Sequence, residues 1–397
     1  MDTLTPALRT LAPLPYHTAV VDYLRLHEPD VWRWANARLT DGQQRESLRS
    51  ALLRDTYRID PQAHPAVHEQ LACAMARLGI AAPATLYQSP GQEMNAALLF
   101  VPGEVHIVVQ GPLLERMSGP ELLAVFGHEL AHYLLWSQDE GVLLAAERIL
   151  HDAVVSGQAS HSQHETWRRY ALHTELFADR GGAVAAGGLA PAVAALVKVQ
   201  TGIGTVDADA YLRQALEVEA RERGASDAHT HPETFIRARA LALWWEDAPE
   251  CEAWIAARLH GPLALENLDL PGQLRLQALT RGFLAHYLLD ADVATEAVLA
   301  RVRMLFPDWQ AGETALGPEH FDAAAVDDGV RAYLNALMLD LALLEPDTQD
   351  AALLRAGQLA ESLGSFDALL LNLRRDAAFG KREIDRYKRR LAKETGE

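Results

Sequence analysis

The stretch His128-Glu129-Leu130-Ala131-His132 lies in an apolar segment whose spacing predicts an α-helix. Residues four apart share one face of a helix, so His128 and His132 can direct two imidazoles at one metal ion. Glu129 lies beside them, where its carboxylate can take a proton from a metal-activated water. The alternative is a buried helix that carries two core histidines. Because two imidazoles and a carboxylate on a buried helix all need partners, we favour the metal site.

The residues in front of this motif predict where its helix begins. Ser118 is a typical N-cap, Pro120 suits the first turn, and Glu121 can complete a capping box with Ser118. Apolar side chains follow at helical spacing, and they are Leu122, Leu123, Phe126, Leu130, Leu134 and Leu135. We therefore expect most of this helix to be buried.

A second pair of residues offers the third protein ligand that a catalytic zinc site requires. Glu175 and Asp179 are again four residues apart on a predicted helix, 43 residues beyond His132. One carboxylate can bind the metal while the other accepts the N–H of a metal-bound imidazole. The alternative is a solvated acidic face, but residues 176–178 between the pair are apolar. The sequence therefore predicts zinc held by two histidines and one of these carboxylates.

Four features in order along the chain resemble the zinc metallopeptidases of family 48. This gluzincin group includes the CAAX prenyl endopeptidases and the bacterial heat-shock membrane proteases. The features are Asn95-Ala96 ahead of a predicted hairpin, the His128–His132 motif, Glu175-x-x-Ala178-Asp179, and Thr230-His231-Pro232 followed by Arg237. Together they span roughly residues 60–245, and the ordered set is far more specific than any one member.

The resemblance implies roles for three residues in the chemistry. It makes Glu175 the third zinc ligand and Glu129 the general base, and it suggests His231 as a hydrogen-bond donor to the oxyanion. One Zn²⁺ per chain is the implied cofactor.

Further residues are expected around this centre. Asp179 would orient a zinc-bound histidine, and Arg237 would anchor a carboxylate of the site or of the substrate, or serve as a structural ion-pair partner. In gluzincins an edge strand beside the active-site helix pairs with the substrate backbone, so Asn95 and Ala96 are candidates for substrate binding. A purely structural hairpin is the alternative.

Composition fits an enzyme without membrane spans. The formal net charge of −18 argues against nonspecific nucleic-acid binding, so no nucleic-acid partner is expected. Cys73 and Cys251 imply no disulfide framework, which fits a cytoplasmic location; each is either an inert buried thiol or a regulatory zinc ligand. No signal peptide is visible, and residues 181–197 predict a helix, a break and a second helix. We therefore expect no membrane insertion, unlike the best-known family members, and no prenylated or transmembrane substrate.

The pattern along the chain predicts an α+β fold that is mostly helical, with a gluzincin-type peptidase domain and a small β-sheet. The expected parts are a helical segment over residues 1–60, a zinc metallopeptidase domain over 61–260 and an all-helical domain over 261–397. In front of the motif, the predicted elements are a helix over 65–78, a strand at 85–87, and a hairpin with strands 96–101 and 105–110.

Residues 137–170 are predicted to form a surface loop that can lie over the cleft. Three histidines there, His151, His161 and His164, suggest metal binding. Residues 156–160 interrupt them with loop composition, so we do not expect them to be ligands.

The last third of the chain shows helical periodicity without catalytic spacing. Helices are expected over 273–289, 294–305, 330–344 and 351–363. The end of the chain is locally basic with acidic residues interleaved, which predicts a solvated terminal helix. A tail that binds a partner or touches nucleic acid is the alternative.

These features predict a zinc-dependent endopeptidase that acts on a protein or peptide. Glu129 would take the proton as water attacks the scissile carbonyl, and zinc and His231 would stabilise the oxyanion. One alternative is an autoinhibited or regulated protease. Its helical domain would bind a partner, or that domain or the 137–170 loop would block the cleft. Another is a zinc-stabilised interaction protein with little turnover. Glu129 argues against the last, because a structural zinc site needs no base.

Overall fold

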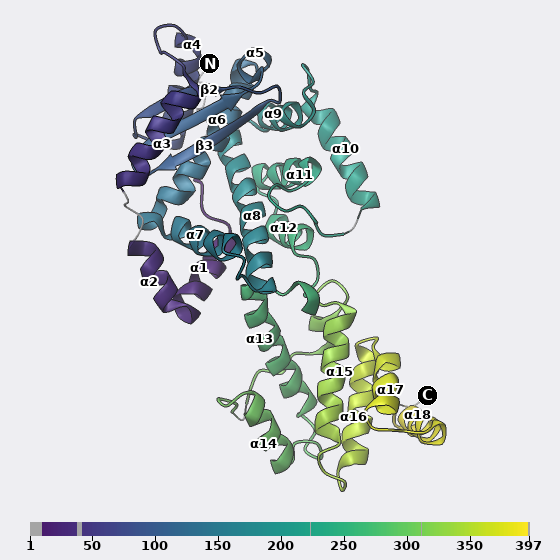
Figure 1. The fold of residues 1–397 in the computed structure, drawn as a ribbon. Coiled ribbons are helices and arrows are strands. Elements are labelled where there is room, and N and C mark those ends of the chain that lie inside the picture. Colours follow the sequence, from purple (N-terminus) through teal and green to yellow (C-terminus); the bar gives the residue numbers. More distant parts are fainter. Residues whose placement is uncertain (1–9, 38–41, 223, 311, 396–397) are drawn as a thin grey trace. The chain divides into compact units, whose positions relative to one another are not determined.

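The structure is a computed structural model that describes residues 10–37, 42–222, 224–310 and 312–395 (Figure 1). Residues 1–9 and 38–41 of the predicted N-terminal segment lie outside the described residues. The chain divides into two compact units, unit 1 (Met1–His260) and unit 2 (Gly261–Glu397). Helices dominate both units, and unit 1 holds a small mixed sheet, which confirms the predicted α+β, mostly helical fold class.

The sheet of unit 1 has four strands in the order β1-β2-β4-β3. Its strands are β1 (Tyr57–Arg58), β2 (Ala84–Ser89), β3 (Asn95–Val101) and β4 (Glu104–Gln110). β2 and β4 are parallel, whereas β3 and β4 form an antiparallel hairpin. Gly103 in the turn has a φ of +80°, which glycine adopts without steric cost. The predicted hairpin and strand are confirmed, and β3 lies at an edge of the sheet.

The described part of unit 1 also contains twelve α-helices. They are α1 (Pro15–His27), α2 (Pro29–Ala37), α3 (Gly42–Asp55), α4 (Pro65–Leu78), α5 (Leu113–Arg116), α6 (Gly119–Ser137), α7 (Val142–Val155), α8 (His161–Ala186), α9 (Leu189–Thr201), α10 (Ala208–Arg221), α11 (Thr234–Trp245) and α12 (Cys251–Leu259). The helix predicted over residues 65–78 is confirmed by α4. The two-residue strand β1 was not predicted, because it exists only through pairing with distant Tyr87 and Gln88.

One apolar core joins the sheet to α4 and α6. Leu86 of β2 and Ile107 of β4 are fully buried against this layer, as are Phe126 and Leu130 of α6. Burial of such side chains contributes roughly 1.5–3 kcal/mol each. The core therefore fixes α6 against the sheet along most of its length.

The prediction of a surface loop over residues 137–170 is wrong. After a short 3-10 turn (Gln138–Gly141), the chain forms α7, and α8 begins at His161. Leu143, Leu144 and Leu150 give α7 a buried apolar face of helical period, a signal that the three histidines obscured. Only residues 156–160 are without helix between α7 and α8.

The Gly/Ala-rich run forms a helix, a break and a second helix, as predicted. α8 ends at Ala186, Gly187 has a φ of +72° and caps it, and α9 begins at Leu189. Pro191 lies in the first turn of α9, where its missing N–H is tolerated. Among the described helices, none is long and apolar enough to cross a membrane.

Glycines allow α6 and α8 to pack at very close range. A Cβ added at Gly181 of α8 would lie 2.3 Å from Ala131 Cβ, and one added at Gly127 of α6 would lie 2.3 Å from Ala185 Cβ. At Gly182 the added atom would lie 2.8 Å from the carbonyl oxygen of Ala124. We call these three glycines the glycine seam.

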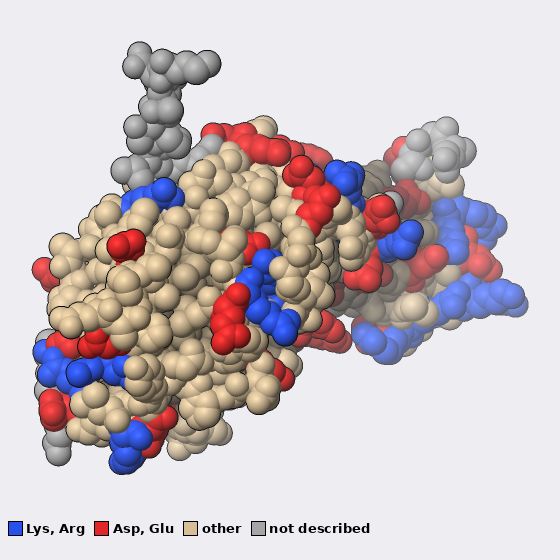
Figure 2. All heavy atoms as spheres, turned by 90° about the horizontal axis from the view of Figure 1, so that it is seen from above, with Lys and Arg blue, Asp and Glu red and all other residues tan. Residues whose placement is uncertain are grey.

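Unit 2 is an array of helices around its own apolar core. Its α-helices are α13 (Leu270–Tyr287), α14 (Glu296–Leu305), α15 (Asp328–Ala342), α16 (Gln349–Ser362), α17 (Phe366–Arg375) and α18 (Lys381–Thr395). The four predicted helices are confirmed within a few residues at each end. Ile384, Tyr387 and Leu391 bury one stripe of α18. Its Lys and Arg residues lie outside that stripe, and Figure 2 shows basic and acidic side chains interleaved where the chain ends.

Candidate metal centre

The helix that carries the first two candidate ligands begins as its sequence indicates. The carboxylate of Glu121 accepts hydrogen bonds from the backbone N–H and the hydroxyl of Ser118, at 2.7 and 2.8 Å. The same Glu121 oxygen lies 2.8 Å from Lys198 Nζ of α9. The predicted start of α6 is confirmed, and this buried ion pair ties it to a neighbouring helix.

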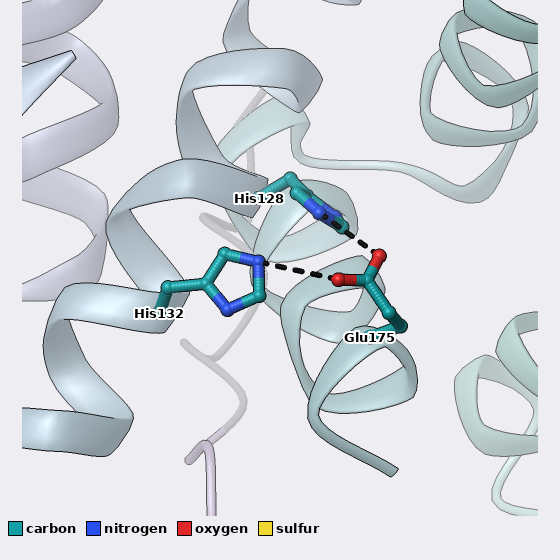
Figure 3. Close-up of side chains that lie close together, drawn as sticks. All are labelled: His128, His132 and Glu175. Carbon is teal, nitrogen blue, oxygen red and sulfur yellow. Dashed lines mark ion pairs between the residues drawn. The ribbon is translucent and has the colours of Figure 1, made fainter. Parts of the chain in front are cut away.

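His128, His132 and Glu175 form one compact cluster (Figure 3). His128 Nε2 lies 3.5 Å from Glu175 Oε2, and His132 Nε2 lies 3.7 Å from Glu175 Oε1. One ligand atom from each residue falls within 4.8 Å of the others. Both imidazoles extend from α6 towards the carboxylate on α8, so all three point their donor atoms at one place.

The donor set fits a zinc ion. Two imidazoles and a carboxylate are a usual ligand set for catalytic zinc, which keeps a fourth position open. Glu175 Oε2 is buried without a hydrogen bond of proper geometry, although basic groups surround it. A buried carboxylate oxygen in that state is costly unless a cation binds it.

Asp179 and Arg237 contact the residues of the cluster and orient them. Asp179 Oδ1 accepts a hydrogen bond from His128 Nδ1 at 3.0 Å, which leaves Nε2 of that imidazole facing Glu175. Arg237 of α11 donates to both oxygens of Asp179, at 2.9 and 2.7 Å, and also lies 3.2 Å from Glu175 Oε2. Arg237 therefore contacts two carboxylates of the site, and whether it anchors them for catalysis or only as a structural ion pair stays a prediction.

His231 lies at the same place from the solvent side. Its side chain is 62% exposed, and its Nδ1 lies 2.9 Å from Glu175 Oε2. It belongs to the segment between α10 and α11, and Thr230, His231 and Pro232 line the cavity around the cluster. The structure thus brings His231 to Glu175, whereas the role of His231 in catalysis stays a prediction.

Glu129 of α6 lies against the edge strand β3. Its Oε2 accepts a hydrogen bond from the backbone N–H of Leu98 at 2.7 Å. That amide points away from β4, since β3 uses its alternate residues to pair with β4. This bond could not be predicted from the sequence, because it depends on how β3 packs beside α6.

Burial and charge set the protonation of the cluster. Burial, then the neighbouring His128, lowers the pKa of His132 to about 4, so its imidazole is neutral and able to bind a metal at neutral pH. Burial opposes the ionisation of Glu175, but His231, Arg237 and the two cluster histidines outweigh it and hold its pKa well below the usual range. Burial, chiefly, raises the pKa of Glu129, which suits a group that must accept and return a proton.

A cavity of about 1340 Å³ surrounds the cluster. Asn95 and Ala96 of β3 line it, as expected for substrate-binding candidates, and so do apolar residues of α9, among them Ala195, Leu196 and Val199. The lining also includes Trp136 and Glu147, which sequence reasoning missed. A single Glu on an amphipathic helix has no diagnostic spacing, and α7 itself was mistaken for a loop.

Other predicted residues lie apart from the cluster. His151 is on α7, exposed and 3.5 Å from Asp152, and it lines the cavity without joining the ligand group. His161 and His164 lie in the first turn of α8. Cys73 and Cys251 are both unpaired thiols, and Cys251 is buried.

Comparison with known proteins identifies one part of the chain. Residues 61–244 match Peptidase family M48, and all the cluster residues fall within that range. No curated protein and no solved structure matches the chain significantly. The chain thus contains a Peptidase family M48 domain without a helix, in its described part, that could span a membrane.

Proposed function

We propose that the Peptidase family M48 domain of this chain is a zinc-dependent endopeptidase that binds one Zn²⁺ through His128, His132 and Glu175. The observation that carries the proposal is the convergence of two imidazoles and one carboxylate at a single place, with Glu129 beside them. The family match supports the peptidase class independently of this geometry.

The residues of the chain divide the chemistry among them. Bound zinc would supply a Lewis acid that polarises the scissile carbonyl and lowers the pKa of water. Glu129 accepts the proton of the attacking water and returns it to the leaving amine, a task for which its raised pKa is suited. His231 is exposed at the rim and donates to the oxyanion that develops at the carbonyl. Asp179 keeps the imidazole of His128 in the tautomer that leaves Nε2 free for the metal.

The edge strand supports a peptide substrate rather than a small molecule. β3 has no strand on its outer side among the described residues, and Asn95 and Ala96 at its start line the cavity. An extended peptide can add to such an edge through main-chain hydrogen bonds. Asn95 and Ala96 are therefore proposed to bind substrate backbone.

The test compares cleavage of an unfolded protein pool by the wild type and Glu129→Gln, with zinc content measured in both. Glu129→Gln should keep zinc and fold while cleavage falls by roughly 10²–10⁴-fold. Glu217→Gln on the exposed face of α10, outside the cavity lining, is the matched control and should cleave like the wild type. Zinc-loaded wild type that leaves the pool intact would refute the peptidase and favour a zinc-stabilised interaction protein.

Unit 2 is proposed to direct or restrain the peptidase, through a protein partner or by regulating access. The support is its separate core and the position of every cluster residue in unit 1. A chain that ends at His260 should keep zinc and cleave an unstructured peptide at least as fast as the full chain, unless unit 2 completes the site. Zinc content and thermal unfolding are the controls for that comparison. The cytoplasmic location expected from the cysteines stays a prediction.

A further inference from the structure

We propose that Glu147 and Trp136 form a pocket beside the metal centre that binds a cationic group of the peptide substrate. The inference rests on the proposed peptidase function and adds a substrate class to it. The cationic group is either a Lys or Arg side chain or the free amino terminus of the peptide, because both present positively charged N–H donors.

The first observation is the place of these residues. Glu147 on α7 and Trp136 at the end of α6 line the same cavity as His128, His132 and Glu175. The indole of Trp136 stacks on the imidazole of His132, with ring centroids 5.3 Å apart. The pocket is therefore adjacent to a candidate zinc ligand.

The second observation is that its polar atoms lack partners. Glu147 Oε2 and Trp136 Nε1 are both buried from solvent, and neither makes a hydrogen bond of good geometry, although the indole N–H lies near enough to the Glu147 carboxylate to lower its pKa. Asp179 and Glu129 differ, because Asp179 is paired with Arg237 and Glu129 accepts the amide of Leu98. Glu233 also has a buried oxygen without a hydrogen bond, but it lies at the start of α11 and not beside Trp136 on α6. Among the described residues, no Lys, Arg or His side chain forms an ion pair with Glu147. Its carboxylate is thus available to a cationic ligand.

The electrostatic cost supports the same conclusion. Burial raises the pKa of Glu147 to about 7, although the indole N–H of Trp136 and the positive charge of Arg148 both act to lower it. An unpaired buried carboxylate destabilises a fold, and a cation that binds it recovers the interaction. Trp136 and the nearby lining residue Trp167 present aromatic surface on which the aliphatic part of a Lys or Arg side chain can pack.

The path of β3 indicates which part of the peptide reaches this pocket. Leu98 lies at Glu129, and two residues later the ring of Phe100 lies 5.6 Å from that of Trp136. The Glu147 pocket is therefore at the carboxyl-terminal end of β3. A peptide antiparallel to β3, as β4 is on the opposite side, would place there the residues that precede the scissile bond.

Binding is measured in zinc-loaded Glu129→Gln protein, so that turnover is not needed. Acetylated peptides that carry Lys, Arg or the uncharged norleucine at one position are compared by fluorescence anisotropy. A neutral peptide with a free or an acetylated amino terminus forms the second arm. We expect the cationic peptide of one arm to bind roughly 10–100-fold more tightly than its neutral counterpart, as for a hydrogen bond to a charged group.

Adding Glu147→Gln should abolish that difference, and Glu147→Met provides a second variant of similar size. Glu217→Gln is the control and should preserve it. If the charge effect occurs with the Lys or Arg peptides, the pocket binds a side chain. If it occurs with the free amino terminus, the pocket binds that terminus. Equal binding of cationic and neutral peptides in both arms, or a difference that survives both Glu147 variants with zinc retained, would overturn the pocket.

Cleavage by the wild type separates this inference from the function on which it rests. Wild-type cleavage sites in a peptide library, read by mass spectrometry, should be enriched in Lys or Arg on the amino-terminal side of the bond, or lie next to free amino termini. Charge-dependent binding without any cleavage would refute the peptidase while supporting the pocket. Cleavage without a charge preference would support the peptidase and refute the cation-binding pocket.

Discussion

Replacing Gly181 by alanine should force apart the two helices that carry the candidate ligands. The new Cβ would lie 2.3 Å from Ala131 Cβ and 2.9 Å from the carbonyl oxygen of Gly127. Carbon atoms prefer separations of about 3.5–4.0 Å, so α6 and α8 must move apart by roughly 1 Å or more. Neither neighbour is the tip of a flexible side chain, so rotamer changes cannot relieve the clash. Overpacking of this kind costs about 1–3 kcal/mol.

The larger effect should be on zinc. His128 and His132 move with α6 while Glu175 moves with α8, and metal–ligand distances tolerate only about ±0.2 Å. We expect zinc affinity to fall by at least the roughly 10–100-fold typical of losing a residue that orients a ligand. The assay is competition with a chromogenic chelator, with thermal unfolding recorded in parallel.

Gly204→Ala is the matched control, because an added Cβ there meets nothing within 4 Å. It should leave zinc affinity and the unfolding temperature unchanged. The reasoning is refuted by a Gly181→Ala protein that binds zinc as tightly as the wild type, because the glycine seam would then not set the spacing of the ligands.

Three further predictions concern individual side chains. Alanine at any of the three ligand positions should abolish stoichiometric zinc binding, measured by metal analysis. Asp179→Asn should weaken zinc affinity or activity by only roughly 10–100-fold. Full zinc occupancy in Glu175→Ala would exclude Glu175 as a ligand. His231→Ala should retain zinc but lower kcat by on the order of 10²–10³ with little change in KM, and an unchanged kcat would assign it a structural role. Glu147 holds its proton more tightly when folded, with a pKa raised to about 7 from 4.5, so the folded state loses stability as pH rises through that window. Glu147→Gln should therefore gain stability over the wild type between pH 4.5 and 7, by up to about 3 kcal/mol, and calorimetric scans showing a constant difference would contradict the shift.

Local signals in the sequence predicted the elements that local chemistry determines. Ser118 and Glu121 indicated the start of α6, and Gly187 coincides with the expected break between α8 and α9. The turn at Gly103 indicated the hairpin. In each case a cap or turn residue predicts the boundary of the element, because its conformation or its hydrogen bonds involve only residues nearby in the sequence.

The remainder depends on contacts between distant segments. Helical spacing placed His128 beside His132 and Glu175 beside Asp179, but only the packing of α6 on α8 brings the two pairs together. Glu147 could not be singled out, because nothing in the sequence shows that its carboxylate is buried without a partner. Its helix, α7, was predicted as a loop because residues 156–160 have loop composition, although Leu143, Leu144 and Leu150 recur at helical spacing.

The bond between Glu129 and Leu98 has a consequence for how a peptide can lie on β3. Alternate amides of an edge strand face the same side, so the amide of Ala96, bonded by the side chain of Asn95, and that of Phe100 are the next ones outward. A peptide along β3 would therefore meet occupied donors at Ala96 and at Leu98, the second directly beside the base. The peptide carbonyl opposite Leu98 is left without a backbone partner. The position of the peptide along the strand, and not its sequence alone, would then decide which bond is presented for hydrolysis.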